Sequence, residues 1–290
     1  MPSDAFDATN TTPAEIARDH KLRSEVMRAL IADPARTTPT KGTVPRVLVQ
    51  FWDEATLPSD VQACVDSWRL LDQRGFRHIL FDDTGAKQYI AARFPPTYSE
   101  AFARCSHPAM RADYFRLAYI SREGGFYVDA DDVFIGAQID ELFSDGDLKL
   151  HPLCYSIPED AMADALTVAA LGSDSDRVFY VNNDPMIAPP RHPVVVNALQ
   201  GATRALLSAG RDDRDIQSLT GPGNLTATLV SHAVELRRLG RPFDFSLLRS
   251  WDAISRSEWE LEYRESARDW RKWARRDFEQ IAGDVSETAP

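Results

Sequence analysis

Short apolar runs alternate with helix-like segments along the first half of the chain, and this alternation limits the fold more than any other feature. The sequences RVLVQFW at 46–52, RHILF at 77–81 and FYV at 126–128 are rich in the branched and aromatic residues of buried strands. Helices are predicted at 58–73, 86–93, 97–104, 108–123, 193–209 and 220–230, with a further strand at 178–181. We therefore predict an α/β fold with a mainly parallel sheet covered by helices.

The chain is predicted to divide near residue 43 into an N-terminal segment and one domain. Residues 1–43 contain a polar tail, a helix that starts at the capping pattern Thr12-Pro13-Ala14-Glu15 and ends near Ala32, and a linker. Apolar positions are sparse in this helix, so we expect it to lie on the surface. Residues 44–290 form the α/β domain, which ends in a long helix predicted at 255–282.

Composition narrows the range of partners. A net charge of −11 over 290 residues argues against nucleic acid, because binding its phosphates requires clustered Lys and Arg. An anionic ligand would need a local source of positive charge, such as a divalent metal ion. The three cysteines, Cys64, Cys105 and Cys154, lack CxxC spacing, so neither a disulfide framework nor a zinc site is expected. The sequence contains no eighteen-residue apolar stretch and no signal-peptide profile, and we expect a cytoplasmic protein.

The stretch GGFYVDADDVF carries the strongest functional pattern. Gly124-Gly125 has the form of a C-terminal helix cap, and Phe126-Tyr127-Val128 is an apolar strand body that ends at Asp129-Ala130-Asp131. Alternate side chains of an extended backbone share a face, so the two carboxylates converge and repel each other unless a cation lies between them. Oxygen ligands suit Mg²⁺ or Mn²⁺ when phosphate oxygens complete the shell. Asp132 points the other way, and a solvated acidic turn is the alternative to a metal site.

A second polar group precedes this stretch on the predicted helix 108–123. Asp113 and Arg116 are three residues apart and share its surface, and Arg111 lies near its start. They could form a clamp for a ligand. The alternative is an intrahelical ion pair, which contributes about 0.2–0.5 kcal/mol.

Taken together, RADYFRLAYISREGGFYVDADDVF resembles the DXD-motif glycosyltransferases of family 32, typified by fungal initiating α-mannosyltransferases, and is more distantly similar to the clostridial glucosylating toxins. The shared pattern is Asp-x-x-Arg, about eight residues, then Gly-Gly-x-Tyr-x-Asp-x-Asp. Further similarities lie at 44–52, 182–193 and 220–222, and the resemblance covers about 44–230. It implies a GT-A fold, a nucleotide-sugar donor and transfer with retention at the anomeric carbon.

The resemblance also implies roles for individual residues. Asp113 and Arg116 would contact the donor sugar, Asp129 the ribose or sugar, and Asp131 the metal, and these four are the predicted catalytic residues. Asp129 is included as a second metal ligand. Trp52 could stack on the nucleotide base, since an aromatic plane suits a nucleobase face, or it could belong to the core. The predicted donor site further includes Arg111, Tyr127 and Asn183.

One part of the family pattern is absent. Members commonly supply a further metal contact, often a histidine, from the C-terminal third, and no histidine follows His232 here. Ser250-Trp251-Asp252 is the nearest substitute. The predicted Mn²⁺ or Mg²⁺ would neutralise charge on the departing diphosphate. Because no carboxylate can be named as nucleophile, we predict same-face attack in which the leaving phosphate accepts the acceptor's proton.

The expected substrates are a UDP- or GDP-hexose and a glycan, lipid-linked or small-molecule acceptor, such as those of bacterial polysaccharide or glycoconjugate synthesis. A haloacid-dehalogenase-type phosphatase is the main rival, because Asp129–Val133 also fits its Asp-x-Asp motif. That fold needs a downstream lysine, and only Lys149 and Lys272 follow. A non-catalytic nucleotide-binding protein with a degenerate transferase fold is a further alternative. The 255–282 helix is expected to pack on the domain or a second subunit, with weak membrane-surface contact as the alternative.

Overall fold

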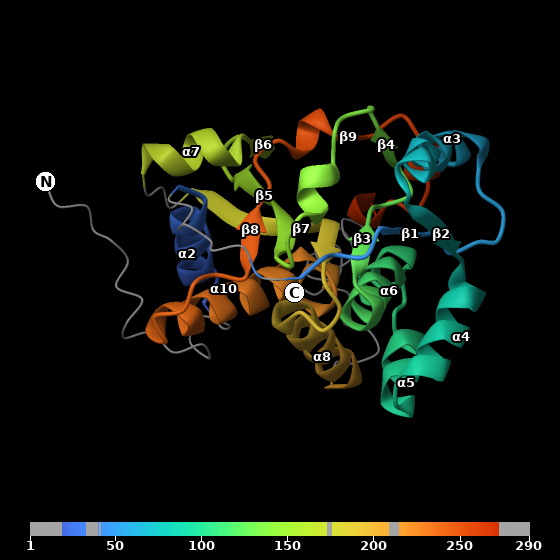
Figure 1. Ribbon diagram of the computed structural model, residues 1–290, viewed down its shortest axis with the longest axis horizontal. Coiled ribbons are helices and arrows are strands. Elements are labelled where there is room, and N and C mark those ends of the chain that lie inside the picture. The colour runs from blue at the N-terminus through green and yellow to red at the C-terminus, as the bar shows by residue number, and fades with distance from the viewer. Residues whose placement is uncertain (1–18, 33–39, 41, 173–175, 209–214, 273–290) are drawn as a thin grey trace, which may run out of the picture.

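One large sheet organises the molecule, as the computed structural model in Figure 1 shows for residues 19–32, 40, 42–172, 176–208 and 215–272. Its strand order is β2-β1-β3-β7-β5-β6, and β8 lies beside β5. A separate two-stranded ribbon joins β4 and β9. The strands are β1 (Val47–Phe51), β2 (Arg77–Phe81), β3 (Gly125–Tyr127), β4 (Asp132–Phe134), β5 (Leu148–Ser156), β6 (Ala161–Ala163), β7 (Arg177–Ala188), β8 (Phe245–Leu247) and β9 (Ser255–Ser257).

Strand direction changes in the middle of this sheet. β1 pairs in parallel with both β2 and β3, whereas β7 runs antiparallel to β3 and to β5. β6 is antiparallel to β5, and β8 is parallel to it. The α/β class is confirmed, and the parallel part is the half formed by the first three strands in sequence. β3 therefore lies where the parallel half meets the antiparallel one.

Helices cover the sheet. In Figure 1, α6, α8 and α10 lie along one side of it, and α8 packs against both α6 and α10. Most predicted helices after residue 43 form within a few residues of their expected bounds, but the one predicted at 220–230 extends to Arg238, and the one predicted at 58–73 continues from α3 into a 3₁₀ turn. The predicted start of the N-terminal helix at Thr12 lies outside the described residues. The helices are α2 (His20–Ala32), α3 (Ser59–Ser67), α4 (Asp83–Arg93), α5 (Pro96–Ala103), α6 (Pro108–Glu123), α7 (Ala165–Leu171), α8 (Pro193–Ser208), α9 (Ile216–Leu219) and α10 (Pro222–Arg238). The 3₁₀ turns are η1 (Trp68–Arg74), η2 (Asp140–Phe143), η3 (Trp251–Ala253) and η4 (Glu262–Glu265).

Helix α2 is not a surface helix, contrary to the prediction. Val26 and Met27 are fully buried, and the helix packs on β7 and α7. Ser24 reinforces this contact, because its hydroxyl donates to the carbonyl of Arg177 and accepts from the amide of Phe179. The few apolar residues of this helix are enough to bury one of its faces, because they lie on the side that packs against the sheet. The domain boundary at residue 43 stays a prediction.

The long helix predicted at 255–282 is wrong over residues 255–269. This part consists of β9, an extended stretch, η4 and a turn, and helix begins only at Trp270, while 273–282 lie outside the described residues. Pairing of β9 with β4 and side-chain contacts to the centre of the molecule override the helical pattern of the sequence. The membrane contact assigned to that helix therefore has no basis over 255–269.

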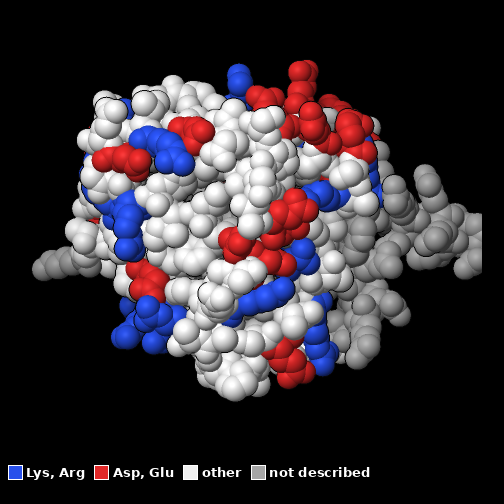
Figure 2. All heavy atoms as spheres, turned by 90° about the vertical axis from the view of Figure 1, so that its right-hand side faces the viewer, with Lys and Arg blue, Asp and Glu red and all other residues white. Residues whose placement is uncertain are grey.

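Charged residues are mixed on the surface. Figure 2 shows acidic side chains gathered at the centre and upper edge of one face, with basic side chains directly beside them. Within the described part of the chain, no helix is both long enough and apolar enough to cross a bilayer. The cytoplasmic location stays a prediction.

Candidate active site

Two consecutive glycines join α6 to β3. Gly124 has a φ of +68° and Gly125 a φ of +112°, values that favour glycine. A Cβ on Gly124 would lie 2.6 Å from the backbone nitrogen of Pro190, and one on Gly125 would lie 2.8 Å from the carbonyl oxygen of Val47. The pair lets α6 end and β3 begin at once against β1, as the predicted glycine cap requires. It thereby brings polar side chains of α6 to the end of β3.

Arg116 occupies the centre of the site. Its Nη2 donates to Oδ1 of Asp129 at 2.6 Å and lies 3.4 Å from Oδ1 of Asp113, and the side chain is only 2% exposed. The guanidinium also stacks on Tyr127, with Cζ 4.4 Å from the ring centroid. Burial acts to lower the pKa of Arg116, but the charge of Asp129 and its neighbours outweighs burial and raises that pKa. Arg116 is therefore a permanent cation between the α6 carboxylate and the DXD pair.

Asp113 is held from three sides. Its Oδ1 accepts from Nδ2 of Asn183 at 2.7 Å, and its Oδ2 accepts from the hydroxyl of Thr220 at 3.3 Å. Burial raises the pKa of Asp113, while Arg116 acts to lower it. The structure thus brings together Asp113, Arg116, Asp129 and Asn183, four residues predicted for the donor site, from α6, the end of β3 and β7.

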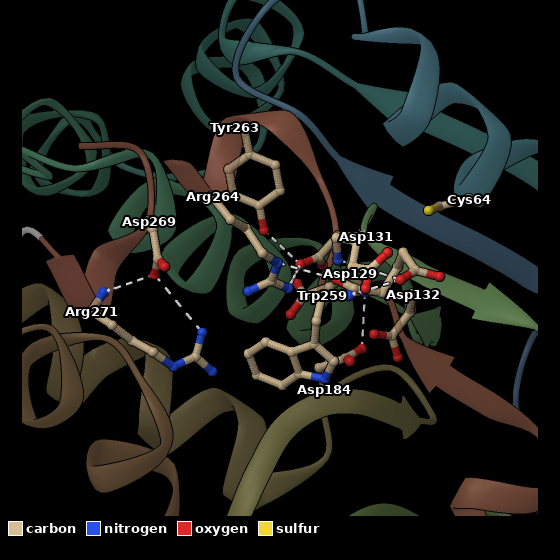
Figure 3. A network of polar contacts seen from close by, with 12 residues as sticks. Cys64, Asp129, Asp131, Asp132, Asp184, Trp259, Tyr263, Arg264, Asp269 and Arg271 are labelled. Carbon is tan, nitrogen blue, oxygen red and sulfur yellow. Dashed lines mark hydrogen bonds and ion pairs between the residues drawn. The ribbon is translucent and has the colours of Figure 1, made fainter. Parts of the chain in front are cut away.

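Four aspartates gather at the end of β3, and we call Asp129, Asp131, Asp132 and Asp184 the acidic cluster (Figure 3). The amide of Asp129 donates to Oδ1 of Asp184 at 2.9 Å. Asp132 lines the same cavity as the DXD pair, and its Oδ2 accepts from the hydroxyl of Ser255 at 3.0 Å. Asp184 belongs to β7, so the cluster joins the two halves of the sheet.

Three members of the acidic cluster, Asp129, Asp132 and Asp184, have raised pKa values. Burial raises the pKa of Asp129 to about 7, against the lowering effect of Arg116. Burial and the charge of Asp131 raise the pKa of Asp132 to about 6. The pKa of Asp184 is raised well above its ordinary value by burial and by Asp132 and Asp129. Burial is the largest cause of each of these shifts, and a further positive charge nearby would favour the ionised carboxylates.

Asp131 is bound by residues far along the chain. Its Oδ2 accepts from the hydroxyl of Tyr263 at 2.6 Å and from Nη2 of Arg264 (Figure 3). Both donors lie on residues 258–272, which we call the C-terminal segment. The amide of Glu258 also donates to the carbonyl oxygen of Asp131 at 2.9 Å. The segment therefore adjoins the predicted metal ligand.

Trp52 lines the cavity but is also a core residue, since it is buried and packs in an apolar cluster with Val61 and Val65, and Arg111 lies outside the cavity lining. Tyr263 meets the Trp52 ring edge-on at a centroid distance of 5.2 Å, and the Arg268 guanidinium lies 4.9 Å from the ring centroid. Arg111 binds Asp83 at 2.9 Å and Asp53 at 3.4 Å, so its guanidinium is committed to two carboxylates.

A cavity of about 1600 Å³ opens onto these residues. That volume exceeds the roughly 300–1000 Å³ of pockets that hold one drug-sized ligand, so it has room for two substrates. Neither Arg111 nor Tyr127 is among its lining residues; Tyr127 is buried beneath Arg116. The cavity is lined by six of the predicted residues, Trp52, Asp113, Arg116, Asp129, Asp131 and Asn183.

The residues fit a divalent metal held by few protein ligands. Within the described ranges no group of three or more His, Cys, Asp or Glu side chains is arranged for a metal ion. Mg²⁺ and its relatives are often held by one or two carboxylates plus substrate phosphates, however, and a positive charge at the acidic cluster would favour its ionised carboxylates. Of the predicted substitute for a third ligand, Trp251 is buried against Trp68, and Asp252 lines the cavity.

Sequence reasoning missed Asp184, Tyr263 and Arg264. A signal for Asp184 was present, because it stands in NNDPMIAPPRHP, a stretch already noted for its family likeness. Arg264 could not be identified from the sequence, because the residues around it have the spacing of a helix. Its contact with Asp131 spans 133 positions and has no local pattern.

The comparisons with known proteins find a family match over the region that contains the DXD pair. Residues 58–146 match the family described as "Glycosyltransferase sugar-binding region containing DXD motif". Over 166 residues the chain is 27% identical to mannosyl phosphorylinositol ceramide synthase SUR1 of Saccharomyces cerevisiae, covering 56% of this chain and 35% of the yeast protein. Over 90 residues it is 25% identical to the uncharacterized glycosyltransferase L373 of Acanthamoeba polyphaga mimivirus, covering 30% and 36%. The chain thus spans about a third of the length of these curated relatives.

Among solved structures, the PaToxG glycosyltransferase aligns over 89% of this chain and 95% of its own, with a TM-score of 0.43 and 14% identity. The matched family region contains α6, β3 and the DXD pair, which are the elements that carry the sequence resemblance. Residues 58–146 of this chain are therefore similar to the sugar-binding region of the DXD-motif glycosyltransferases.

Proposed function

We propose that this protein is a metal-dependent, retaining glycosyltransferase that moves a hexose from a UDP- or GDP-sugar to an acceptor. The observation that carries the proposal is the connected group Asp113–Arg116–Asp129, which faces the same cavity as Asp131. Charged groups fixed by one another are preorganised to bind the hydroxyl groups of a sugar without rearranging.

The donor is proposed to lie along the end of β3. Arg116 and Asp113 bind sugar hydroxyls, and Asp129, whose side chain is 34% exposed, binds the sugar or ribose. Trp52 binds the base through its ring, on which Arg268 now lies. Asp131 and Asp129 hold the metal, which supplies positive charge to the departing diphosphate. Arg111 and Tyr127 act indirectly in this arrangement, by fixing the position of α6 and the orientation of Arg116.

The acceptor is proposed to enter over the antiparallel half of the sheet. Met162 and Tyr180 line the cavity there, and Trp270 of the C-terminal segment also lines it; these side chains offer apolar and aromatic surface to a sugar ring or a lipid-linked glycan. The name of the yeast relative specifies a mannosyl group and a ceramide, so mannosyl donors and lipid-linked acceptors come first in the search.

Retention is proposed to proceed by same-face attack, in which the acceptor oxygen bonds to the anomeric carbon as the bond to the diphosphate breaks. The acceptor's proton passes to the leaving phosphate. A sugar trapped covalently on an Asp or Glu side chain, detected by peptide mass spectrometry, would contradict this mechanism.

The deciding experiment measures donor hydrolysis. UDP- and GDP-sugars are incubated with the protein and Mn²⁺, and release of the nucleoside diphosphate is followed. Asp131→Asn should abolish the activity, whereas Asp140→Asn, a matched change in an exposed ion pair with Arg46 outside the cavity, should preserve it. The proposal fails if no donor is hydrolysed and Asp131→Asn binds nucleotide as well as the wild type.

The two rival functions predict different results. A phosphatase would need a lysine at the site, yet Lys149 binds Asp145 and Lys272 binds Glu265, and neither lines the cavity. Release of inorganic phosphate from simple phosphoesters would nevertheless favour that class. Metal-dependent binding of nucleoside diphosphate without turnover of any sugar donor would favour a non-catalytic binding protein.

A further inference from the structure

The protein places its own cation on the predicted metal ligand. Nη2 of Arg264 donates to Oδ2 of Asp131, and Arg264 Nε donates to the carbonyl oxygen of Glu258 at 3.1 Å. The side chain is buried, with its Cζ 4.5 Å from the centroid of the Trp259 ring. Asp131 therefore already has a positively charged partner in this arrangement, although it also faces the cavity.

A second guanidinium lies on the same ring. Cζ of Arg271 is 4.6 Å from the Trp259 centroid, and its Nη1 lies 3.8 Å from Oδ1 of Asp269. Figure 3 shows Arg264 reaching Asp131 in the acidic cluster and Arg271 bound to Asp269. Both side chains line the cavity. Burial and the charge of Arg264 both act to lower the pKa of Arg271, so the two like charges repel each other, and a nearby anion would offset that repulsion.

We infer that Arg264 and Arg271 form a diphosphate-binding pair, and that Arg264 exchanges its bond to Asp131 for one to the donor diphosphate. This inference rests on the proposed function. Without donor, Arg264 neutralises Asp131; with donor, its guanidinium turns to the phosphate oxygens, which match its planar fork. Asp131 is then free to bind the metal.

The exchange makes metal and nucleotide binding interdependent. A metal ion and a guanidinium at the same carboxylate oxygen repel each other, so Arg264 weakens metal binding to the free protein. The diphosphate removes that competitor and gains a charged partner. Each ligand therefore promotes binding of the other through Arg264, by the reciprocity that governs linked equilibria.

The test measures the two affinities separately by isothermal titration calorimetry. Mn²⁺ is titrated into the full chain without nucleotide, and UDP or GDP is titrated in the presence of a chelator. Arg264→Gln should bind Mn²⁺ about tenfold more tightly and nucleotide about tenfold more weakly than the wild type, as expected for loss of one hydrogen bond between charged groups. Lys272→Gln removes a charge from the same segment at an exposed ion pair and should change neither affinity.

The expected changes in Mn²⁺ and nucleotide affinity have opposite signs, and this distinguishes the inference from a purely structural role of Arg264. If Arg264 only held the segment in place, its loss would weaken both ligands together, and that result would overturn the inference, as would an unchanged Mn²⁺ affinity. Arg264→Lys keeps the positive charge but loses the planar guanidinium, and its Mn²⁺ affinity should stay as low as that of the wild type. This variant is used in place of Arg264→Gln if the latter does not fold. Wild-type protein that binds both ligands upholds the proposed site whatever Arg264 does, whereas wild-type protein that binds neither overturns both proposals.

Discussion

Replacing Arg116 by methionine tests whether the centre of the site is held together electrostatically. Methionine has a similar length but no charge, so Asp113 and Asp129 would lose the cation that lies 3.4 and 2.6 Å from them. Removing one partner of a buried ion pair costs about 3–5 kcal/mol. We expect about 3 kcal/mol at pH 8, the lower end of that range, because Asp129 is 34% exposed and can be hydrated.

The destabilisation should depend on pH with a definite sign. Without Arg116, the pKa values of Asp113 and Asp129 rise further above the value of 3.8 that applies in the unfolded chain. The folded variant then binds more protons than its unfolded chain does, so its stability falls as pH rises. For each extra proton that the folded variant binds, its free energy of unfolding increases by about 1.4 kcal/mol per pH unit as the pH is lowered. The deficit relative to wild type should therefore shrink by about 1–3 kcal/mol between pH 8 and pH 5.5.

Urea unfolding followed by tryptophan fluorescence, in buffer with a chelator, measures this deficit at both pH values. Arg238→Met, which breaks an exposed ion pair with Glu235, should leave the midpoint nearly unchanged. Adding Asp129→Asn to Arg116→Met should restore part of the loss, because the unpaired carboxylate is removed as well. A deficit as small as that of Arg238→Met, or one that does not change with pH, would refute the electrostatic reasoning.

Three further predictions concern other parts of the molecule. Burial acts to raise the pKa of Asp244, but hydrogen bonds from His192 and His232 outweigh burial and lower that pKa. In urea titrations, Asp244→Asn should therefore be less stable than the wild type at pH 7, and the difference should become smaller below about pH 4. A difference that does not change with pH would contradict this. Removing metal with EDTA should stop donor hydrolysis, and added Mn²⁺ should restore it; hydrolysis that persists in EDTA would exclude a metal requirement. Trp52→Leu should raise the donor KM about tenfold with little change in kcat, and an unchanged KM would place the base elsewhere.

Local patterns predicted the centre of the fold and of the site. The spacing from Asp113 to Asp131 lies within one helix, one glycine pair and one short strand, and each of these follows from neighbouring residues. Strand direction in the other half of the sheet had no such signal. β7 is a long strand that runs antiparallel to β3, and its direction depends on pairing with residues more than 50 positions away.

The C-terminal segment shows why the rest could not be predicted. Its spacing of Trp259, Tyr263 and Trp270 fits one face of a helix, and that pattern was the only local information. In the folded protein, however, the hydroxyl of Tyr263 and the guanidinium of Arg264 bind Asp131, and Ser255 binds Asp132. In this segment, the contacts that pair buried charged groups outweigh the helix propensity of the sequence, and such contacts form only in the folded protein.

The long separation between Asp131 and Arg264 also has a consequence for synthesis of the chain. The two residues are 133 positions apart, so at about 5–20 residues per second the ribosome adds the arginine roughly 7 to 27 s after the aspartate. Until Arg264 has been made, Asp131 lacks this charged partner, so the C-terminal segment completes the charge balance at the centre of the molecule only after the DXD pair has been synthesised.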